Sequence, residues 1–431
     1  MGRIWNFLYW LQGRLWFIPA IMSLAALGLA YVLLGPGIDL FEDFTGSWWL
    51  YSGDAGTARD LLSTLLAGMI TMTSLVVSIT VVVLSLAANQ LGPRLIYNFI
   101  EDRRIQVVIG QFVATILYTL LALRTIGEEL GGDAAVPHVV VTVASVLTIS
   151  CLFALLFHVN LIAHSIVSDT IVREVANSLD EAVGRLPREP GPARGEVATF
   201  SPSWPHRCAT SIGKSGYVQL IDHEGLCKLA CDHDLQIVLD IRAGHFVLAH
   251  SAHFEVRAHQ PVSDEILDGI AGMVIVGAGR TPTQDLEFSV RQLVEIALRA
   301  LSPSLNDPFT AIAVIDRLAA ALEILSDRAL PPSEYRDEDG QVRLIADAID
   351  FEGLVDAAFN QIRRSAASST SVLIGLAHRL ADLLRIVASQ DQRDAIAKHL
   401  KMIERTAQGI AEPNDRDHLL GLIVTAMAGK G

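Results

Sequence analysis

Small hydroxyl side chains recur along one side of an apolar segment between residues 60 and 90. Placed on a helix at 100° per residue, they share a sector about 80° wide. Hydroxyl groups can exchange hydrogen bonds with the hydration shell of a passing ion without trapping the ion. Copies of this helix around an axis would therefore line a water path, with an acidic mouth favouring cations and a valine constriction. The predicted lining residues are Asp60, Thr64, Thr71, Ser74, Ser78, Val82, Ser85 and Asn89.

A packing role is the alternative interpretation of the same face. Small residues let helix backbones approach, and their hydroxyls can bond a neighbouring helix or the carbonyl four residues earlier. Thr73 and Thr80 point to the opposite side, so this helix also carries hydroxyls where no pore could lie. The sequence leaves both interpretations open.

A second polar group occupies residues 280–308. Its arginines and acids could converge on an anionic metabolite, but a structural network of arginine and carboxylate pairs holding two helices together is favoured. Asp307 is suited to the N-cap of a helix, and Pro308 to its first turn. The candidate residues are Arg280, Gln284, Asp285, Arg291, Arg299, Asn306 and Asp307.

Histidines and cysteines supply two weaker candidates. His223, Cys227 and Cys231 recur every four residues, a helical spacing at which soft ligands could bind zinc. The same face is expected to be buried, where cysteine packs as a small hydrophobic residue, so no metal site is predicted. Four further histidines could titrate near neutral pH but are expected to be ordinary strand and turn residues. These are His245, His250, His253 and His259.

No enzyme motif accompanies these groups. Gly213, Lys214 and Ser215 resemble part of a phosphate loop, but Cys208 stands where its first glycine is needed, and a strand follows. Neither a nucleophile elbow nor a dinucleotide fingerprint occurs. We therefore expect a protein that is not an enzyme and needs no cofactor.

Hydrophobic residues make up 51% of the 431 residues and are concentrated in the first 165. Segments of this length and apolarity predict a membrane domain at 1–165 with four transmembrane helices. Basic residues favour the N-terminus and the loop between the second and third helices, which places both, and everything after the fourth helix, in the cytoplasm. The predicted spans are about 15–34, 61–88, 105–123 and 138–163.

The remaining chain is polar, with a different pattern in each part. The fold class is an α-helical membrane domain with four transmembrane helices, followed by a cytoplasmic α+β domain and a mostly helical C-terminal region. The acidic interval 327–342 is expected to be a loop, and residues 197–200 a short strand. The predicted parts are a stalk helix at 166–186, a proline-rich linker at 187–205, a small α/β domain at 206–280 and a helical domain at 281–431.

Net charge and cysteine content limit the partners and the compartment. A net charge of −14 argues against nucleic acid, which requires a concentrated basic face. Four cysteines are too few and too unevenly placed for a disulfide framework. The expected partners are the lipid bilayer, further copies of the chain and a small ion or anionic metabolite.

Several motifs together resemble a known family. They are the run 106–110, the segment 216–222, the Gly244 turn, Arg280-Thr-Pro-Thr-Gln-Asp285 and Arg299-Ala-Leu-Ser-Pro-Ser-Leu-Asn-Asp-Pro308. In this combination the chain resembles the bacterial domain of unknown function 2254 family over nearly its whole length. The resemblance implies a four-span protein of the bacterial inner membrane with a cytoplasmic C-terminal region, and no established activity. Ala243 and His245 depart from the proline and acidic residue expected beside Gly244.

These observations favour a homo-oligomeric ion channel or pore. The second transmembrane helix would line the path, and the cytoplasmic domain would assemble or gate it. The alternative is a non-conducting scaffold or sensor that binds a metabolite or a protein through its cytoplasmic domain.

Overall fold

The computed structural model describes residues 16–34, 50–91, 103–128, 138–165, 168–188 and 204–429, without the side chains of 86–91, 126–128, 163–165 and 168–170. The predicted strand at 197–200 and most of the predicted linker lie outside these residues. The chain divides into two compact units, Met1–Thr170 and Ile171–Gly431. We call them the membrane unit and the C-terminal unit and describe each by itself.

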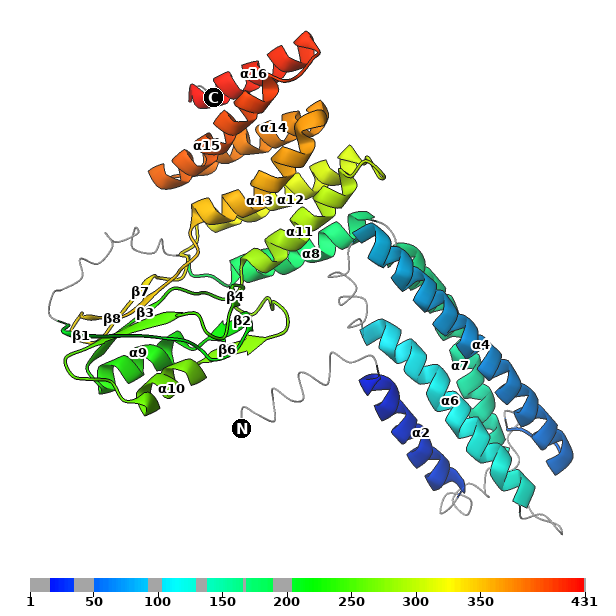
Figure 1. The fold of residues 1–431 in the computed structure, drawn as a ribbon. Helices are drawn as coiled ribbons and strands as arrows, with labels where there is room; N and C mark the ends of the chain where they lie inside the picture. The colour runs from blue at the N-terminus through cyan, green and yellow to red at the C-terminus, as the bar shows by residue number, and fades with distance from the viewer. Residues whose placement is uncertain are drawn as a thin grey trace. The chain divides into compact units, whose positions relative to one another are not determined.

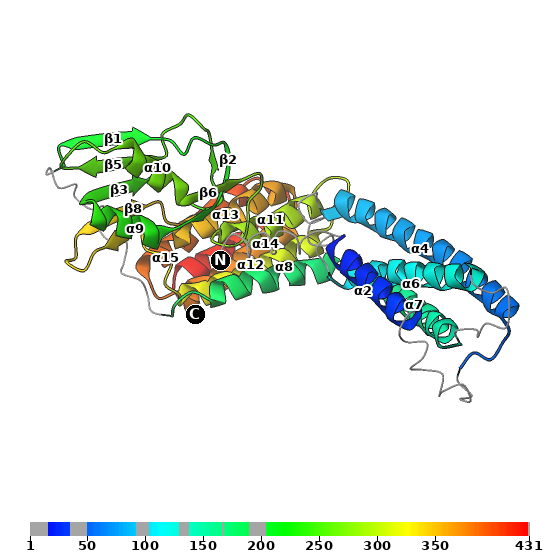
Figure 2. The same cartoon turned by 90° about the horizontal axis from the view of Figure 1, so that it is seen from below.

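The membrane unit contains four helices that are long and apolar enough to cross a bilayer, among the described residues. Their ends lie close to the ends of the predicted spans, and the predicted fold class is confirmed. Figure 2 shows the four helices side by side. They are α2 (Phe17–Leu34), α4 (Ala55–Leu91), α6 (Arg103–Glu128) and α7 (His138–Ser165).

Helix α6 is the centre of the membrane unit and packs against α2, α4 and α7. Small side chains allow close approach, because a Cβ added at Gly110 of α6 would lie 2.6 Å from the sulfur of Met22 in α2. Polar groups also join helices, since Gln111 donates to Ser150 of α7 at 2.7 Å. The buried Tyr118 hydroxyl donates to the carbonyl oxygen of Val140 at 3.2 Å. Polar residues on α6 therefore hold the helices together.

Two sheets form the α/β part of the C-terminal unit (Figure 1). The larger has the order β1 (His206–Thr210), β5 (Phe254–Ala258), β3 (Leu235–Leu239), β8 (Val342–Ala346) and β7 (Glu334–Arg336). The pair β3 and β8 is parallel, and the other pairs in it are antiparallel. The smaller sheet has the order β4 (Phe246–Val247), β2 (Gly216–Ile221) and β6 (Val274–Gly277).

Two short helices, α9 (His223–Asp232) and α10 (Asp264–Gly272), accompany the strands. Asp222 caps α9 through a bond from the amide nitrogen of Gly225, as its position before the helix predicts. Leu226 and Ala230 of α9 enter the core with Ile237 and Leu344 of the larger sheet. The prediction of a loop throughout 327–342 is wrong, because β7 and β8 begin within it. Strand β8 gains its ladder partner from β3, about a hundred residues earlier, which no local pattern reveals.

The rest of the C-terminal unit is helical. Three pairs of consecutive helices stack on one another (Figure 1). Within the stack α12 and α14 run in the same direction, because Ile312 meets Gly375 and Asp316 pairs with Arg379. The pairs are α11 (Glu287–Ala300) with α12 (Pro308–Ser326), α13 (Phe351–Ser365) with α14 (Thr370–Ile386), and α15 (Gln390–Ala407) with α16 (Pro413–Met427).

Helix α8 (Ser168–Gly184) follows α7 after two residues and packs on the first helix pair. Its C-terminal end is fixed by Arg328, which donates to the carbonyl oxygen of Leu186 at 2.9 Å, and by the amide of Ala329, which donates to Pro187 at 2.9 Å. The helix at the predicted stalk therefore belongs mostly to the C-terminal unit.

Candidate functional site

The predicted hydroxyl face of α4 is exposed in the single chain. Every predicted lining residue whose side chain is described is exposed, whereas Ala58, Leu62, Met69 and Val76 on the opposite side are buried. The side chain of Asn89 lies outside the described residues. Within a single chain, the hydroxyl face therefore does not serve to pack α4 against the described parts of α6 and α7.

Several hydroxyls on this face are satisfied by their own helix. Thr64 donates to the carbonyl oxygen of Asp60 at 2.8 Å, and Thr71 to that of Ala67 at 3.0 Å. Ser85 donates to the carbonyl oxygen of Val81 at 2.9 Å. Each such bond uses the hydroxyl hydrogen and leaves the two lone pairs of the oxygen able to accept hydrogen bonds, as a water-lined or partner-lined face requires.

The opposite face of α4 uses hydroxyls for packing. Thr80 donates to the carbonyl oxygen of Val76 at 2.7 Å and lies 3.0 Å from Nε2 of His158 in α7. His158 is fully buried. The two faces of α4 thus use hydroxyl groups differently, and the predicted lining face lies within the broad exposed side of α4, which also includes Ile70, Val77 and Val81.

The motif at 280–308 divides into two places. Arg280, Gln284, Asp285 and Arg291 lie around the start of α11, whereas Arg299, Asn306 and Asp307 lie at the turn between α11 and α12. The structure does not bring all seven predicted residues together.

At the start of α11, a charge network surrounds the buried Glu287. Arg291 donates to its carboxylate at 2.7 Å and Arg242 at 2.8 Å, while Arg280 donates to Asp285 at 2.6 Å. Burial raises the pKa of Glu287, but the hydrogen bonds and charges of Arg291 and Arg242 outweigh burial and hold that pKa below its usual value.

Asp347, which follows strand β8, completes the network by accepting from Arg242 at 2.9 Å. Three arginines thus meet three carboxylates. Because these charges balance within the network, it is better suited to join the α/β part to α11 than to bind an anion.

Two further contacts attach the network to the smaller sheet. The side chain of Gln284 accepts from the amide of Ile221 at 2.8 Å and donates to its carbonyl oxygen at 3.0 Å. Gly244, at φ +90°, approaches so closely that an added Cβ would lie 2.4 Å from Oδ2 of Asp285. The Gly244 turn and the 280–285 motif are therefore one structural feature.

Sequence reasoning missed Arg242, Glu287 and Asp347. One local signal existed, because Glu287 precedes Arg291 by four residues at the start of a predicted helix. Arg242 and Asp347 come from distant parts of the chain, and no local spacing connects them with α11.

The turn between α11 and α12 is closely hydrogen-bonded. Asp307 accepts from the amide of Thr310 at 3.1 Å and from its hydroxyl at 2.6 Å, which holds the pKa of Asp307 below its usual value. Pro308 opens α12, as predicted. Asn306 has φ +46°. Arg299 pairs with Glu295 at 3.7 Å.

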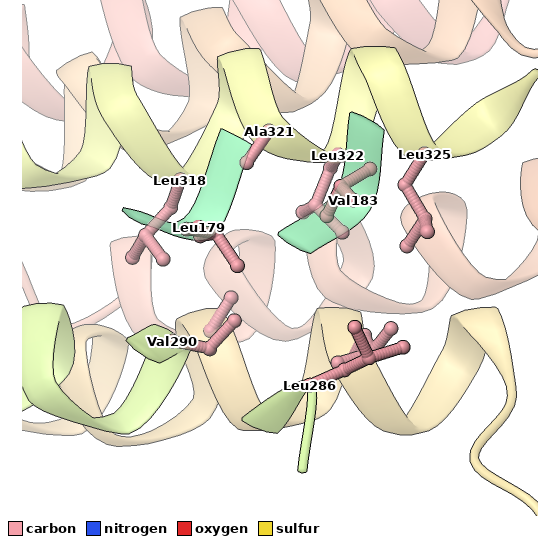
Figure 3. Close-up of a pocket in the computed structure, with 10 residues that line it drawn as sticks. Leu179, Val183, Leu286, Val290, Leu318, Ala321, Leu322 and Leu325 are labelled. Carbon is pink, nitrogen blue, oxygen red and sulfur yellow. The ribbon is translucent and has the colours of Figure 1, made fainter. Parts of the chain in front are cut away.

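A fully apolar pocket marks the seam where α8 packs on the helix stack (Figure 3). Its empty volume is about 290 Å³, part of it open to solvent. No polar side chain lines it, so nothing there would orient a polar ligand. The lining residues are Leu179, Val183, Leu286, Val290, Leu318, Ala321, Leu322, Leu325, Leu354 and Ala358.

The histidine and cysteine candidates do not form a metal site, although the side chains of Cys227 and Cys231 are close enough to hydrogen-bond. Among the described residues, no three His, Cys, Asp or Glu side chains converge as metal ligands. His223 stacks on Tyr335, with ring centroids 5.2 Å apart. The buried His253 accepts from the amide of Ile212 through Nδ1 at 3.2 Å, and His259 packs on Trp204.

Comparison with known proteins supplies a family but no activity. A family model described as a predicted membrane protein (DUF2254) matches residues 12–382. Two relatives described as uncharacterised proteins, from Mycobacterium bovis and Mycobacterium tuberculosis, are each 32% identical to this chain over 424 residues. The alignments cover 97% of this chain and 81% of each relative. No solved structure gives a significant match.

Proposed function

The chain belongs to the domain of unknown function 2254 family of predicted membrane proteins, and from this premise we propose that it is a homo-oligomeric ion channel or pore rather than an enzyme. Copies of α4 surround an axis in this proposal, with their hydroxyl faces turned toward a water path. The C-terminal unit assembles or gates the oligomer.

One observation carries this proposal. The exposed hydroxyl face of α4 lies opposite the side that packs within the membrane unit. A polar stripe turned toward hydrocarbon gains no partner for its remaining hydrogen-bonding capacity. Turned toward other copies of α4, the same stripe can hold water, and stacked hydroxyl rings can exchange bonds with a hydrated ion.

The order of residues along the stripe suggests a role for each level of the path. A ring of Asp60 at one mouth would attract cations, and the middle of the path would be lined by Ser74 and Ser78. Exposed Val82 would form an apolar constriction that can gate by excluding water.

Helix α8 provides a route by which the C-terminal unit could act on the path. Only residues 166 and 167 separate it from α7, and its apolar side is held in the seam against α11 and α12. A displacement of the helix stack would therefore be carried to the end of a membrane span.

We also propose that the protein lies in the bacterial inner membrane with its N-terminus and C-terminal unit in the cytoplasm, by the distribution of basic residues. A cysteine introduced at Ser52 should react with an impermeant reagent from outside the cell. One introduced at Val424 should react only after the membrane is opened. The reverse pattern would overturn this orientation.

Ion flux into liposomes tests the pore. Ser78→Leu should abolish flux through purified protein without changing its assembly, because it places an apolar side chain on the lining face. Val77→Leu is the matched control, since Val77 is exposed at the same depth but about 100° around the helix. Asp60→Asn should change cation selectivity. Equal flux in wild type and Ser78→Leu would refute the pore.

The second candidate is a non-conducting scaffold or sensor. The observation that favours it is the open edge of the charge network, where the side chain of Arg291 is 44% exposed and could meet an anionic metabolite or an acidic protein. Such a ligand should stabilise the protein by mass action, and the effect should disappear in Arg291→Ala. An identical thermal shift in Arg291→Ala would exclude binding through this edge.

A further inference from the structure

The turn between α11 and α12 presents two apolar side chains to solvent. Phe309 is 82% exposed, more than any other large apolar side chain in the described chain, and Leu305 is 47% exposed. Phe153, on a candidate membrane-spanning helix, is 68% exposed. A pair of such side chains on a single turn is unusual for a surface that faces only water.

This turn lies at the end of the helix stack where α8 begins. In Figure 3, residue numbers rise in the same direction along α8, from Leu179 to Val183, and along α12, from Leu318 to Leu325. The bonds from Arg328 and Ala329 to the end of α8 agree with this parallel arrangement. The first turn of α12, which carries Phe309, therefore lies at the same end as the first turns of α8.

The connection between the fourth candidate span and α8 is short. The fourth candidate span ends at Ile162, and α8 begins at Ser168. Six residues reach at most about 20 Å, even when fully extended. The beginning of α8 can therefore be no further than about 20 Å from the end of the span, which leaves the exposed turn within possible reach of the membrane surface.

The backbone hydrogen bonds of the turn are compatible with contact with the membrane surface. The amides of Leu305 and Asn306 donate to the carbonyl oxygen of Ser302, and that of Asp307 donates to Ala300 at 2.8 Å. Its backbone needs few bonds from water, which lowers the cost of placing it among lipid headgroups. The side chain of Arg299, in the last turn of α11, is one-third exposed and can meet a lipid phosphate.

We propose that the turn between α11 and α12 is a membrane-contact site, in which Leu305 and Phe309 enter the interfacial layer of the bilayer. Asn306, Asp307 and Pro308 shape the turn that presents them. The partner is the lipid surface, and the contact holds the C-terminal unit at a second point besides its covalent link to α7. This inference depends on the membrane spans and not on ion conduction.

Photo-crosslinking in the full chain tests the proposal. The photoreactive residue benzoylphenylalanine would replace Phe309, and the protein would be reconstituted in vesicles containing anionic lipid, irradiated and analysed by intact mass. The matched control carries the same residue at Ile386, which is 49% exposed at the other end of α14 and about 20 Å further along the stack. Benzoylphenylalanine at Phe153, on a transmembrane helix, is the positive control.

We expect lipid adducts at position 309 to exceed those at 386 by at least several-fold and to approach those at 153. Adduct levels at 309 equal to those at 386, with adducts present at 153, would overturn the proposal. Crosslinked protein dimers at 309 without lipid adducts would also overturn it, and would assign the turn to contact between copies of the chain.

Discussion

Replacing Gly244 by alanine should destabilise the C-terminal unit far more than the same change at Gly213. Both glycines have positive φ, +90° at Gly244 and +73° at Gly213, so alanine at either position meets a backbone cost of about 1–2 kcal/mol. Their surroundings differ. An added Cβ has nothing within 4 Å at Gly213, but at Gly244 it would lie 2.4 Å from the Asp285 carboxylate and 2.6 Å from the Arg280 guanidinium.

The additional cost at Gly244 is the separation of that ion pair. The side chains of Asp285 and Arg280 are 3% and 16% exposed, so solvent replaces little of their attraction. Breaking a buried pair costs about 3–5 kcal/mol, and the nearby Glu287 carboxylate compensates part of this for Arg280. We expect about 2–4 kcal/mol beyond the cost at Gly213.

Thermal unfolding of the purified full chain measures this difference. At about 2–4 °C per kcal/mol for a unit of this size, Gly244→Ala should unfold roughly 4–16 °C below Gly213→Ala. Equal unfolding temperatures in the two variants would refute the conclusion that the Gly244 turn and the Arg280 and Asp285 pair are packed against each other.

Two further predictions concern the helix stack. Leu322→Ala should lower the stability of the C-terminal unit by about 2–4 kcal/mol, because it enlarges the apolar pocket beneath α8, and Val424→Ala on the exposed side of α16 should change it little in the same denaturation assay. Burial lowers the pKa of His399 below its usual value of 6.5, and this effect is larger than the opposing effect of Asp356 at 2.7 Å. As the pH falls, His399 is therefore protonated in the unfolded chain at a higher pH than in the folded chain. The free energy of unfolding should decrease as pH drops from about 7 through the folded-state pKa. His399→Gln should remove this part of the pH dependence, and a pH profile unchanged by the substitution would refute the assignment to His399.

Local patterns predict the features of this fold that depend on nearby residues. The membrane spans follow from runs of apolar residues, and the starts of α9 and α12 follow from Asp222 and from Asp307 with Pro308. Strand β5 and helix α10 carry local signals that could have been used, because Phe254, Val256 and Ala258 alternate with Glu255 and Arg257, and Ile266, Leu267 and Ile270 recur at helical spacing after Ser263. Strand β1 is short and shows no clear period.

The charge network shows where local reasoning ends. Arg280, Asp285 and Arg291 occur in a recognisable motif, but Arg242 and Asp347 join them only because β3 and β8 are neighbours in the sheet. Whether these arginines are available to bind a ligand or are already paired with carboxylates of the protein depends on such distant residues. The hydroxyl face of α4 was predicted from its period alone, and its exposure in the single chain depends on which side α6 and α7 cover.

The parallel pairing of β3 with β8 also affects how the chain folds while it is being synthesised. Leu239 must wait for Ala346, its partner in the register, to be synthesised. At about 5–20 residues per second, that interval lasts roughly 5–20 s. During this time one edge of β3 has no permanent partner, and an open edge can pair with another nascent chain. A fragment that ends before residue 342 keeps this edge open indefinitely, so we expect such truncations to aggregate while the complete chain does not.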